Sequence, residues 1–311
     1  MTHLISVPLD LWSEFCHPCN MSPQSISFAP VTVNRAAVPS PVIVSIPHAG
    51  RIYPQEILDE ARVPQTVLEQ FEDRWSDLIA RKAQTEGATI VTARYARAVA
   101  DCNRAELQMA STDVANDLRG QMNAVGVKER AGLGVVPTRL GTAGVLWRRP
   151  IDRASWERRL NMIHRPYHRA IDQEITCALH LHGYAVLIDL HSMPSISANR
   201  VGHGQKLIVG DLFGASGADW LTGAAIEMGQ HMGLSVGLNR PYAGGYILER
   251  HAAPKRHIYG VQLEWDRSLY LTPHGDPCIT ALIELEKFFS DFAALVSMGD
   301  PRHYPMNVAA E

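Results

Sequence analysis

Three apolar runs of this chain each end in, or carry, a side chain suited to metal binding or proton transfer. His48 follows "VIVSIP", His191 follows "LIDL", and Glu264 stands in "VQLEW". A polar group beside a buried strand is costly unless it is paired, so polar residues at strand ends indicate a site. Two neutral imidazoles and one carboxylate are the ligands of a catalytic zinc that keeps a fourth position open for water. The two histidines therefore predict a metal site that needs a third, acidic ligand.

The acidic segment "FEDRWSD" offers three candidates for that ligand. A helix is predicted over residues 65–86, because the stretch opens with Pro and Thr and closes at a Gly. On such a helix Asp73 and Asp77 share a face, whereas Glu72 points elsewhere. The alternative interpretation is an ordinary solvated helix face with an interleaved arginine. The residues by themselves leave the choice between the three acids open.

Further polar residues stand near predicted strand ends. Asp101, Asn103 and Arg104 follow the apolar run "ARAVA". Asp189 lies two residues before His191, so on a strand both point to the same face and the carboxylate can orient the imidazole. Asp189 is thus predicted to support the metal ligands without binding the metal, and Asp101 is assigned the same role. Because open α/β sheets bind ligands beyond the carboxyl ends of their strands, these residues are expected to meet at one site.

The elements that must position these residues alternate between strands and helices. Strands are predicted over 40–48, 184–192, 206–211, 234–239 and 258–266, with two short strands within 88–103. Helices are predicted over 54–61, 65–86, 156–183, 217–233 and 276–297. This alternation predicts an α/β layered fold with a largely parallel or mixed sheet.

The chain is interpreted as one domain with irregular ends. Residues 1–38 are rich in Pro, Ser and Asn without a sustained period and are predicted to form an irregular N-terminal extension. A single α/β domain is predicted over 39–300, followed by a C-terminal tail over 301–311. Cys16 and Cys19 form a C-x-x-C without a second pair at zinc-finger spacing, which favours an incidental pair.

Composition limits the class of protein and its partners. The 311 residues are 46% hydrophobic and 20% charged, with a formal net charge of −3, which is typical of a globular protein without a general attraction to nucleic acid or anionic membranes. No run approaches the roughly 20 apolar residues that span a bilayer. An N-terminus without a basic and then apolar block, together with an odd count of five cysteines, favours a reducing cytoplasm. The sequence leaves a homo-oligomer open.

Nine segments, in chain order, resemble the N-formylglutamate amidohydrolase family. They are "SIPHAGRIYP", "EDRWSDL", "RAVADCNRAE", "GLGVVPTRLG", "RPYHRAI", "LIDLHSMPS", "VGDLFGAS", "NRPYAGGYILERHAAP" and "VQLEWDRSLYL". The resemblance extends over nearly everything from about 41 to 272. The resemblance implies a zinc-dependent enzyme that cleaves N-formyl-L-glutamate into formate and glutamate in histidine degradation. More distantly, "DLHS" and "QLE" resemble the zinc carboxypeptidases. That likeness implies a three-layer α/β/α sandwich of the phosphorylase/hydrolase-like type around a mixed, largely parallel sheet.

Carried over by position, the resemblance implies roles for individual residues. His48 and His191 become ligands of one zinc ion per chain, and Glu264 becomes the base that takes a proton from the attacking water. The zinc carboxypeptidases place their acidic ligand three residues after the first histidine. Arg51 occupies that place here, so the acid must come from farther along the chain.

The third ligand is therefore taken from the acidic segment. Asp73 is preferred because its place in the motif is acidic among the family variants. Glu72 and Asp77 stay open as alternatives.

The implied substrate carries two carboxylates, which calls for cations with a fixed donor geometry. Arginine is suited to this by its bidentate fork. Arg104 beside Asn103, and Arg250 after the turn "AGGY", are the candidates, and Gly244 and Gly245 would let the backbone approach the ligand. The alternative for each arginine is a surface salt bridge.

Two other functions are weighed against this one. The first is hydrolysis of another N-acyl amino acid or a small peptide, because the motifs do not specify the substrate. The second is binding of a small ligand without catalysis. The intact His48, His191 and Glu264 argue against a non-catalytic protein.

Overall fold

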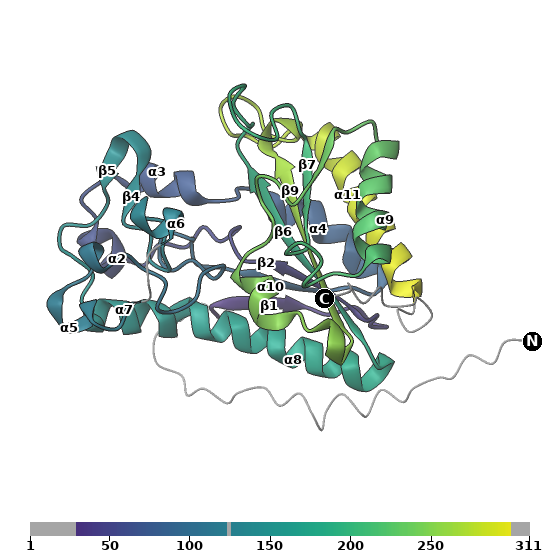
Figure 1. The fold of residues 1–311 in the computed structure, drawn as a ribbon, viewed down its shortest axis with the longest axis horizontal. Coiled ribbons are helices and arrows are strands. Elements are labelled where there is room, and N and C mark those ends of the chain that lie inside the picture. The colour runs from purple at the N-terminus through teal and green to yellow at the C-terminus, as the bar shows by residue number, and fades with distance from the viewer. Residues whose placement is uncertain (1–28, 123–125, 300–311) are drawn as a thin grey trace, which may run out of the picture.

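A computed structural model of the chain describes residues 29–122 and 126–299, in which seven strands form one mixed sheet (Figure 1). The strands are β1 (Val31–Asn34), β2 (Val42–Ile46), β3 (Thr89–Ala93), β6 (Ala185–Met193), β7 (Leu207–Gly210), β8 (Val236–Leu238) and β9 (Ile258–Asp266). Their order across the sheet is β1-β3-β2-β6-β9-β7-β8. Strands β3, β2, β6 and β9 are parallel, β1 and β7 run antiparallel to β3 and β9, and β8 is parallel to β7. The prediction of a mixed, largely parallel sheet is confirmed.

The centre of the sheet is formed by β6 and β9, which are nine residues long and buried at every position. In their parallel register Asp189 pairs with Gln262 and His191 pairs with Glu264. The carboxyl ends of parallel strands lie at the same edge of a sheet, and paired residues point to the same face. The fold therefore brings His191 and Glu264 side by side, although they are far apart in the sequence.

Helices cover both faces of the sheet, as Figure 1 shows. Successive strand residues point to opposite faces, so Leu187 packs in one core cluster with Ile171 while Ile188 packs in the other with Phe289. The predicted three-layer α/β/α sandwich is confirmed. One outer layer contains α8 (Arg165–His182) and α10 (Tyr246–His251), and the other contains α4 (Ser76–Ala80), α9 (Asp219–His231) and α11 (Ile279–Met298).

The helix predicted over 65–86 is wrong as a continuous element. The structure divides it into α3 (Gln65–Leu68), η1 (Glu69–Phe71), α4 and η2 (Arg81–Glu86). Trp75 has a left-handed backbone with φ of 65°, and Asp73 N donates a hydrogen bond of 2.9 Å to His48 O. Because this tertiary contact holds Asp73 in a non-helical segment, Asp73 and Asp77 do not share a helical face.

The second strand predicted within 88–103 is also absent from this described segment. After β3 ends at Ala93, the chain forms a loop that carries Asp101. The backbone N–H of Asp101 donates a hydrogen bond of 2.7 Å to Val135 O. Val135 belongs to a lobe beside the sheet, so contacts with that lobe replace strand pairing in the loop. The lobe contains α2 (Gln55–Glu60), η3 (Ser111–Asp113), α5 (Asn116–Arg119), α6 (Val127–Arg130), β4 (Arg139–Leu140), η4 (Gly141–Ala143), β5 (Gly144–Val145) and α7 (Arg153–Arg159).

The long helical region predicted over 156–183 forms as a nearly continuous rod. It runs through α7, the π-helical turn η5 (Leu160–His164) and α8, and it stops at Gly183, whose φ of 78° suits glycine. The strand β6 follows at once. Two further short helices, η6 (Pro254–Arg256) and η7 (Arg267–Leu269), flank β9.

The predicted irregular extension over 1–38 is wrong for part of its length. Val31–Asn34 forms β1 and pairs with β3 at the sheet edge, so the sheet begins before the predicted boundary at residue 39. Cys16, Cys19 and the predicted tail over 301–311 lie outside the described residues. Among the helices of the described chain, none is long and apolar enough to cross a membrane.

Candidate active site

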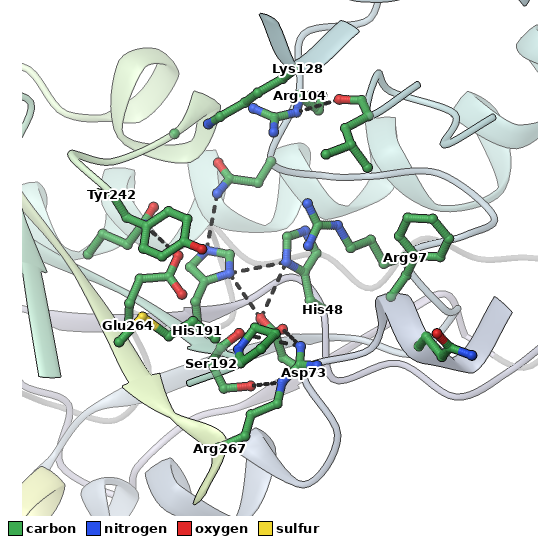
Figure 2. A pocket seen from close by; sticks show the side chains of 18 of the residues that line it. His48, Asp73, Arg97, Arg104, Lys128, His191, Ser192, Tyr242, Glu264 and Arg267 are labelled. Carbon is green, nitrogen blue, oxygen red and sulfur yellow. Dashed lines mark hydrogen bonds and ion pairs between the residues drawn. The ribbon is translucent and has the colours of Figure 1, made fainter. Parts of the chain in front are cut away.

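Three buried side chains meet at the carboxyl edge of the sheet: His48 after β2, His191 on β6, and Asp73 between η1 and α4 (Figure 2). His191 Nδ1 lies 3.1 Å from His48 Nδ1 and 3.1 Å from Asp73 Oδ2. His48 Nδ1 lies 3.4 Å from the same oxygen. The three atoms form a small triangle, which is the arrangement expected of three ligands around one ion.

The far side of each imidazole is held by a carboxylate. His48 Nε2 lies 2.7 Å from Asp101 Oδ1, and His191 Nε2 lies 2.8 Å from Asp189 Oδ2. An ionised carboxylate only accepts hydrogen bonds, so each Nε2 must carry the proton. Each neutral ring then presents a lone pair at Nδ1, toward Asp73. The predicted supporting roles of Asp101 and Asp189 agree with these contacts.

This arrangement fits a bound divalent metal ion. Two nitrogen lone pairs and one carboxylate oxygen of Asp73 converge, and such a group is repulsive without a cation at its centre. Zinc bonds of about 2.0–2.1 Å place neighbouring tetrahedral ligand atoms about 3.3–3.4 Å apart, close to the observed triangle. His48, Asp73 and His191 could therefore hold the ion at the cavity.

The charges around the triangle also favour a cation. Burial raises the pKa of Asp73, but His191 and His48 in their protonated form and the charge of Arg267 outweigh it in the absence of a metal ion, so the pKa lies well below its usual range. For His191, burial lowers the pKa, but Asp189 and Asp73 outweigh burial and hold it well above its usual range. The site thus stabilises positive charge at this point, either as a proton or as a metal ion.

Two arginines neutralise the carboxylates around the triangle, and neither is among the residues predicted from the sequence. Arg267 Nη2 donates a hydrogen bond of 2.8 Å to Asp73 Oδ1, whereas the other carboxylate oxygen, Oδ2, faces the imidazoles. Arg97 Nε donates a hydrogen bond of 2.8 Å to Asp101 Oδ2. Arg97 and Asp101 are four residues apart, a spacing that pairs side chains on a helix, but this segment is a loop. Arg267 reaches the site because it directly follows β9, which ends at Asp266.

Glu264 faces the same cavity from β9. Its side chain accepts a hydrogen bond of 2.9 Å from Gln262 Nε2, and the residue is 9% exposed. Val261, Leu263 and Trp265 lie on the opposite face in the hydrophobic core. Burial raises the pKa of Glu264 above its usual range, as does the charge of Asp73, while His191 opposes them. A carboxylate with a raised pKa beside a metal triangle is suited to proton transfer.

A cavity of about 320 Å³ opens over these groups. Asn103 lies in its wall, and Nδ2 is 3.1 Å from His191 Nε2 while Oδ1 accepts a hydrogen bond from Ile247 N at 2.9 Å. Gly245 allows this close packing, because a Cβ there would lie 2.5 Å from the Asn103 side chain. The wall also contains Arg97, Arg104, Lys128, Leu133, Ser192, Tyr242, Gly244, Gln262 and Arg267.

Arg104 lies in the cavity wall as predicted and is 8% exposed. Arg104 Nε donates a hydrogen bond of 3.0 Å to Leu133 O, and this contact holds the side chain in place. Burial lowers the pKa of the guanidinium, and Asp101 opposes this effect. Gly244, with φ of 126°, needs the conformational freedom of glycine in the same wall.

Three predicted or alternative residues do not reach the cavity. Arg250, which was predicted to bind substrate, does not line this cavity, because its side chain is turned to Tyr246 OH at 3.2 Å and to Asp172 at 3.6 Å. Glu72 accepts hydrogen bonds from Tyr53 and Arg74. Asp77 forms an exposed pair with Arg51 at 3.0 Å. Among the three acids of the segment, Asp73 alone joins the histidines.

Lys128 on α6 is a cavity residue that sequence reasoning missed. Its segment has no apolar period that places it at a strand end, so no sequence signal connects it with the histidines. Tyr242 was also missed, although it stands in the quoted segment "NRPYAGGYILERHAAP".

The fold and this site together define a hydrolytic enzyme built on a three-layer α/β/α sandwich. The N-formylglutamate amidohydrolase family matches residues 40–271, and the chain belongs to that family. It is 30% identical over 245 residues, covering 74% of this chain and 82% of the relative, to N-formylglutamate deformylase of Pseudomonas putida. The identity to the protein of that name from Pseudomonas aeruginosa is 29% over 242 residues, with the same coverage of 74% and 82%.

The fold agrees with a solved structure. The crystal structure of N-formylglutamate amidohydrolase from Ralstonia eutropha superposes with a TM-score of 0.80 at 23% identity, covering 87% of this chain and 98% of that one. At this identity the likeness bears on the fold alone.

Proposed function

We propose that this enzyme cleaves the formamide C–N bond of N-formyl-L-glutamate to give formate and L-glutamate, with zinc as its metal. The observation that carries the proposal is the placement of Glu264 beside His191, across the β6–β9 register, over a triangle of metal-ligand atoms. The names of two relatives, both N-formylglutamate deformylases, support the substrate. The proposal includes a cytoplasmic location and a role in histidine degradation.

His48, Asp73 and His191 would hold the zinc ion. Held there, the ion would polarise the formyl oxygen as a Lewis acid and would lower the pKa of a water toward about 7. Asp101 and Asp189 keep the two rings in the tautomer that binds metal, through their contacts of 2.7 and 2.8 Å.

Glu264 performs the proton transfers. As a carboxylate it takes a proton from the attacking water, whose oxygen forms a bond to the formyl carbon. The same proton then passes to the nitrogen of the leaving amine as the C–N bond breaks. Formate retains the water oxygen, and the amino group of glutamate receives the proton. Burial of Glu264 keeps bulk water from competing for that proton.

Arg104 is proposed to bind a substrate carboxylate. Its Nε is already occupied by Leu133 O, so the rest of the guanidinium is available to the cavity. Asn103 and the backbone at Gly244 and Gly245 line the path between Arg104 and the histidines.

Arg104→Lys is expected to lower kcat/KM for N-formyl-L-glutamate by about 10-fold or more, because one ammonium cannot keep both the Leu133 contact and a two-point grip on a carboxylate. Steady-state kinetics measure the change. The matched control is Arg81→Lys, since Arg81 is 67% exposed and pairs with Glu286 outside the cavity. Equal kinetics for Arg104→Lys and the parent would reassign Arg104 to a structural role.

A panel assay tests the function as a whole. Formate release is measured on N-formyl, N-acetyl and dipeptide derivatives of several amino acids, together with metal content of the purified protein. Clear preference for N-formyl-L-glutamate supports the proposal. A preference for another N-acyl amino acid or a small peptide would favour the second function, and no turnover with retained ligand binding would favour the non-catalytic one.

A further inference from the structure

The cavity wall contains four cations, of which two are already neutralised. Arg97 pairs with Asp101 at 2.8 Å and Arg267 pairs with Asp73 at 2.8 Å. The remaining two, Arg104 and Lys128, lie on the wall away from Arg267, as Figure 2 shows. No carboxylate in the described part of the chain is within ion-pair distance of either.

These two cations affect one another. Partial burial lowers the pKa of Lys128, and the positive charge of Arg104 lowers it further. Two neighbouring like charges over one cavity repel, and an anion between them relieves the repulsion. A ligand with two carboxylates can neutralise both cations, one with each group.

Hydrogen bonds of the neighbouring residues fix the backbone position of Lys128 at the cavity. Its neighbour Glu129 is buried and turned away from the cavity, where it accepts a hydrogen bond of 2.6 Å from Gln108 Nε2. Lys128 O accepts a hydrogen bond of 2.9 Å from Leu133 N, and Leu133 O in turn holds Arg104 Nε at 3.0 Å. Leu133 therefore couples the backbone position of Lys128 to the side chain of Arg104.

We infer that Lys128 is the specificity residue that binds the side-chain carboxylate of the N-formyl dicarboxylic amino acid, while Arg104 binds its α-carboxylate; this rests on the proposed function. The difference in burial between the two cations indicates which substrate carboxylate each of them binds. Arg104 is buried and follows Asn103, which contacts His191, whereas Lys128 is an exposed residue of the cavity wall. In the substrate, the α-carboxylate is near the formamide and the side-chain carboxylate is two carbon atoms farther away. The farther cation thus meets the farther carboxylate.

The test compares N-formyl-L-glutamate with N-formyl-L-glutamine, which has nearly the same shape but a neutral side chain. Lys128→Met is expected to lower kcat/KM for the glutamate substrate about 10- to 100-fold, mainly through KM, because one charge-assisted hydrogen bond is lost. The glutamine substrate should change less than threefold, so discrimination between the two collapses. Lys128→Arg should restore most of the preference, and Lys255→Met, an exposed lysine outside the cavity, serves as the matched control.

Two outcomes contradict the assignment. An equal loss on both substrates would mean that Lys128 binds the α-carboxylate or supports the wall, and an unchanged glutamate substrate would remove Lys128 from recognition. If the parent releases formate from neither substrate, the proposed function fails, and calorimetry with glutarate then tests the cation pair separately. Glutarate should bind the parent at least 10-fold more tightly than Lys128→Met; equal binding would overturn the inference.

Discussion

Glu264→Gln is expected to lower kcat by about 10²- to 10⁴-fold while the protein folds normally and binds metal like the parent. Glutamine keeps the shape of the side chain and can still contact Gln262, whose amide lies 2.9 Å from Glu264 in the parent. It cannot accept the proton of the attacking water. Steady-state formate release gives the rate, and metal analysis with thermal melting gives the controls. If the variant turns over within a few-fold of the parent, another group activates the water.

The pH profile provides an independent check on Glu264. The base must be ionised, and burial raises its pKa above the usual range for glutamate. Activity should therefore be lost as the pH falls through this raised pKa, which places the acidic limb of kcat/KM above the usual titration of a free glutamate. Glu264→Gln should remove this limb from the residual activity. An acidic limb that persists in the variant would belong to a different group.

Removal of the metal is the second large effect. A chelator is expected to abolish formate release, and His191→Ala should purify without a full equivalent of zinc, because the triangle with His48 and Asp73 loses one corner. Metal content by mass spectrometry is the readout, and His274→Ala, an exposed histidine outside the cavity, is the control. Retention of a full equivalent of zinc in His191→Ala would remove the proposed metal centre.

The fold is expected to survive the loss of metal. The sheet is covered on both faces by hydrophobic clusters, which include Leu187 and Ile171 on one side and Ile188 and Phe289 on the other. These cores do not depend on the site for burial of apolar surface. Circular dichroism of the chelated protein should show one cooperative melting transition. A non-cooperative transition would mean that the metal supplies part of the folding energy.

The strongest elements of the fold could be predicted because their signal is local. The runs around β6 and β9 are apolar throughout, and such a run indicates a strand buried on both faces. Gly183 ends the long helix because its left-handed backbone suits glycine. His48, His191 and Glu264 stand out for the same reason, since a polar residue contrasts with the apolar run beside it.

The position of Asp73 depended on the tertiary structure. Helical periodicity put it on one face with Asp77, but the hydrogen bond from Asp73 N to His48 O holds it in a non-helical segment. The resemblance to the family favoured Asp73, and the structure shows why it meets the histidines while Asp77 turns to Arg51. Local propensity is weak, and a buried contact outweighs it.

The sequence by itself determined the α/β alternation, the two central strands, and the residue types of the site, because each leaves a pattern among neighbours along the chain. Tertiary structure alone decided which groups share the cavity. It placed Arg267 on Asp73, turned Arg250 to the surface and brought Lys128 beside Arg104. These three residues lie on short helices, and contacts with residues that are distant in the sequence set where each short helix lies relative to the sheet.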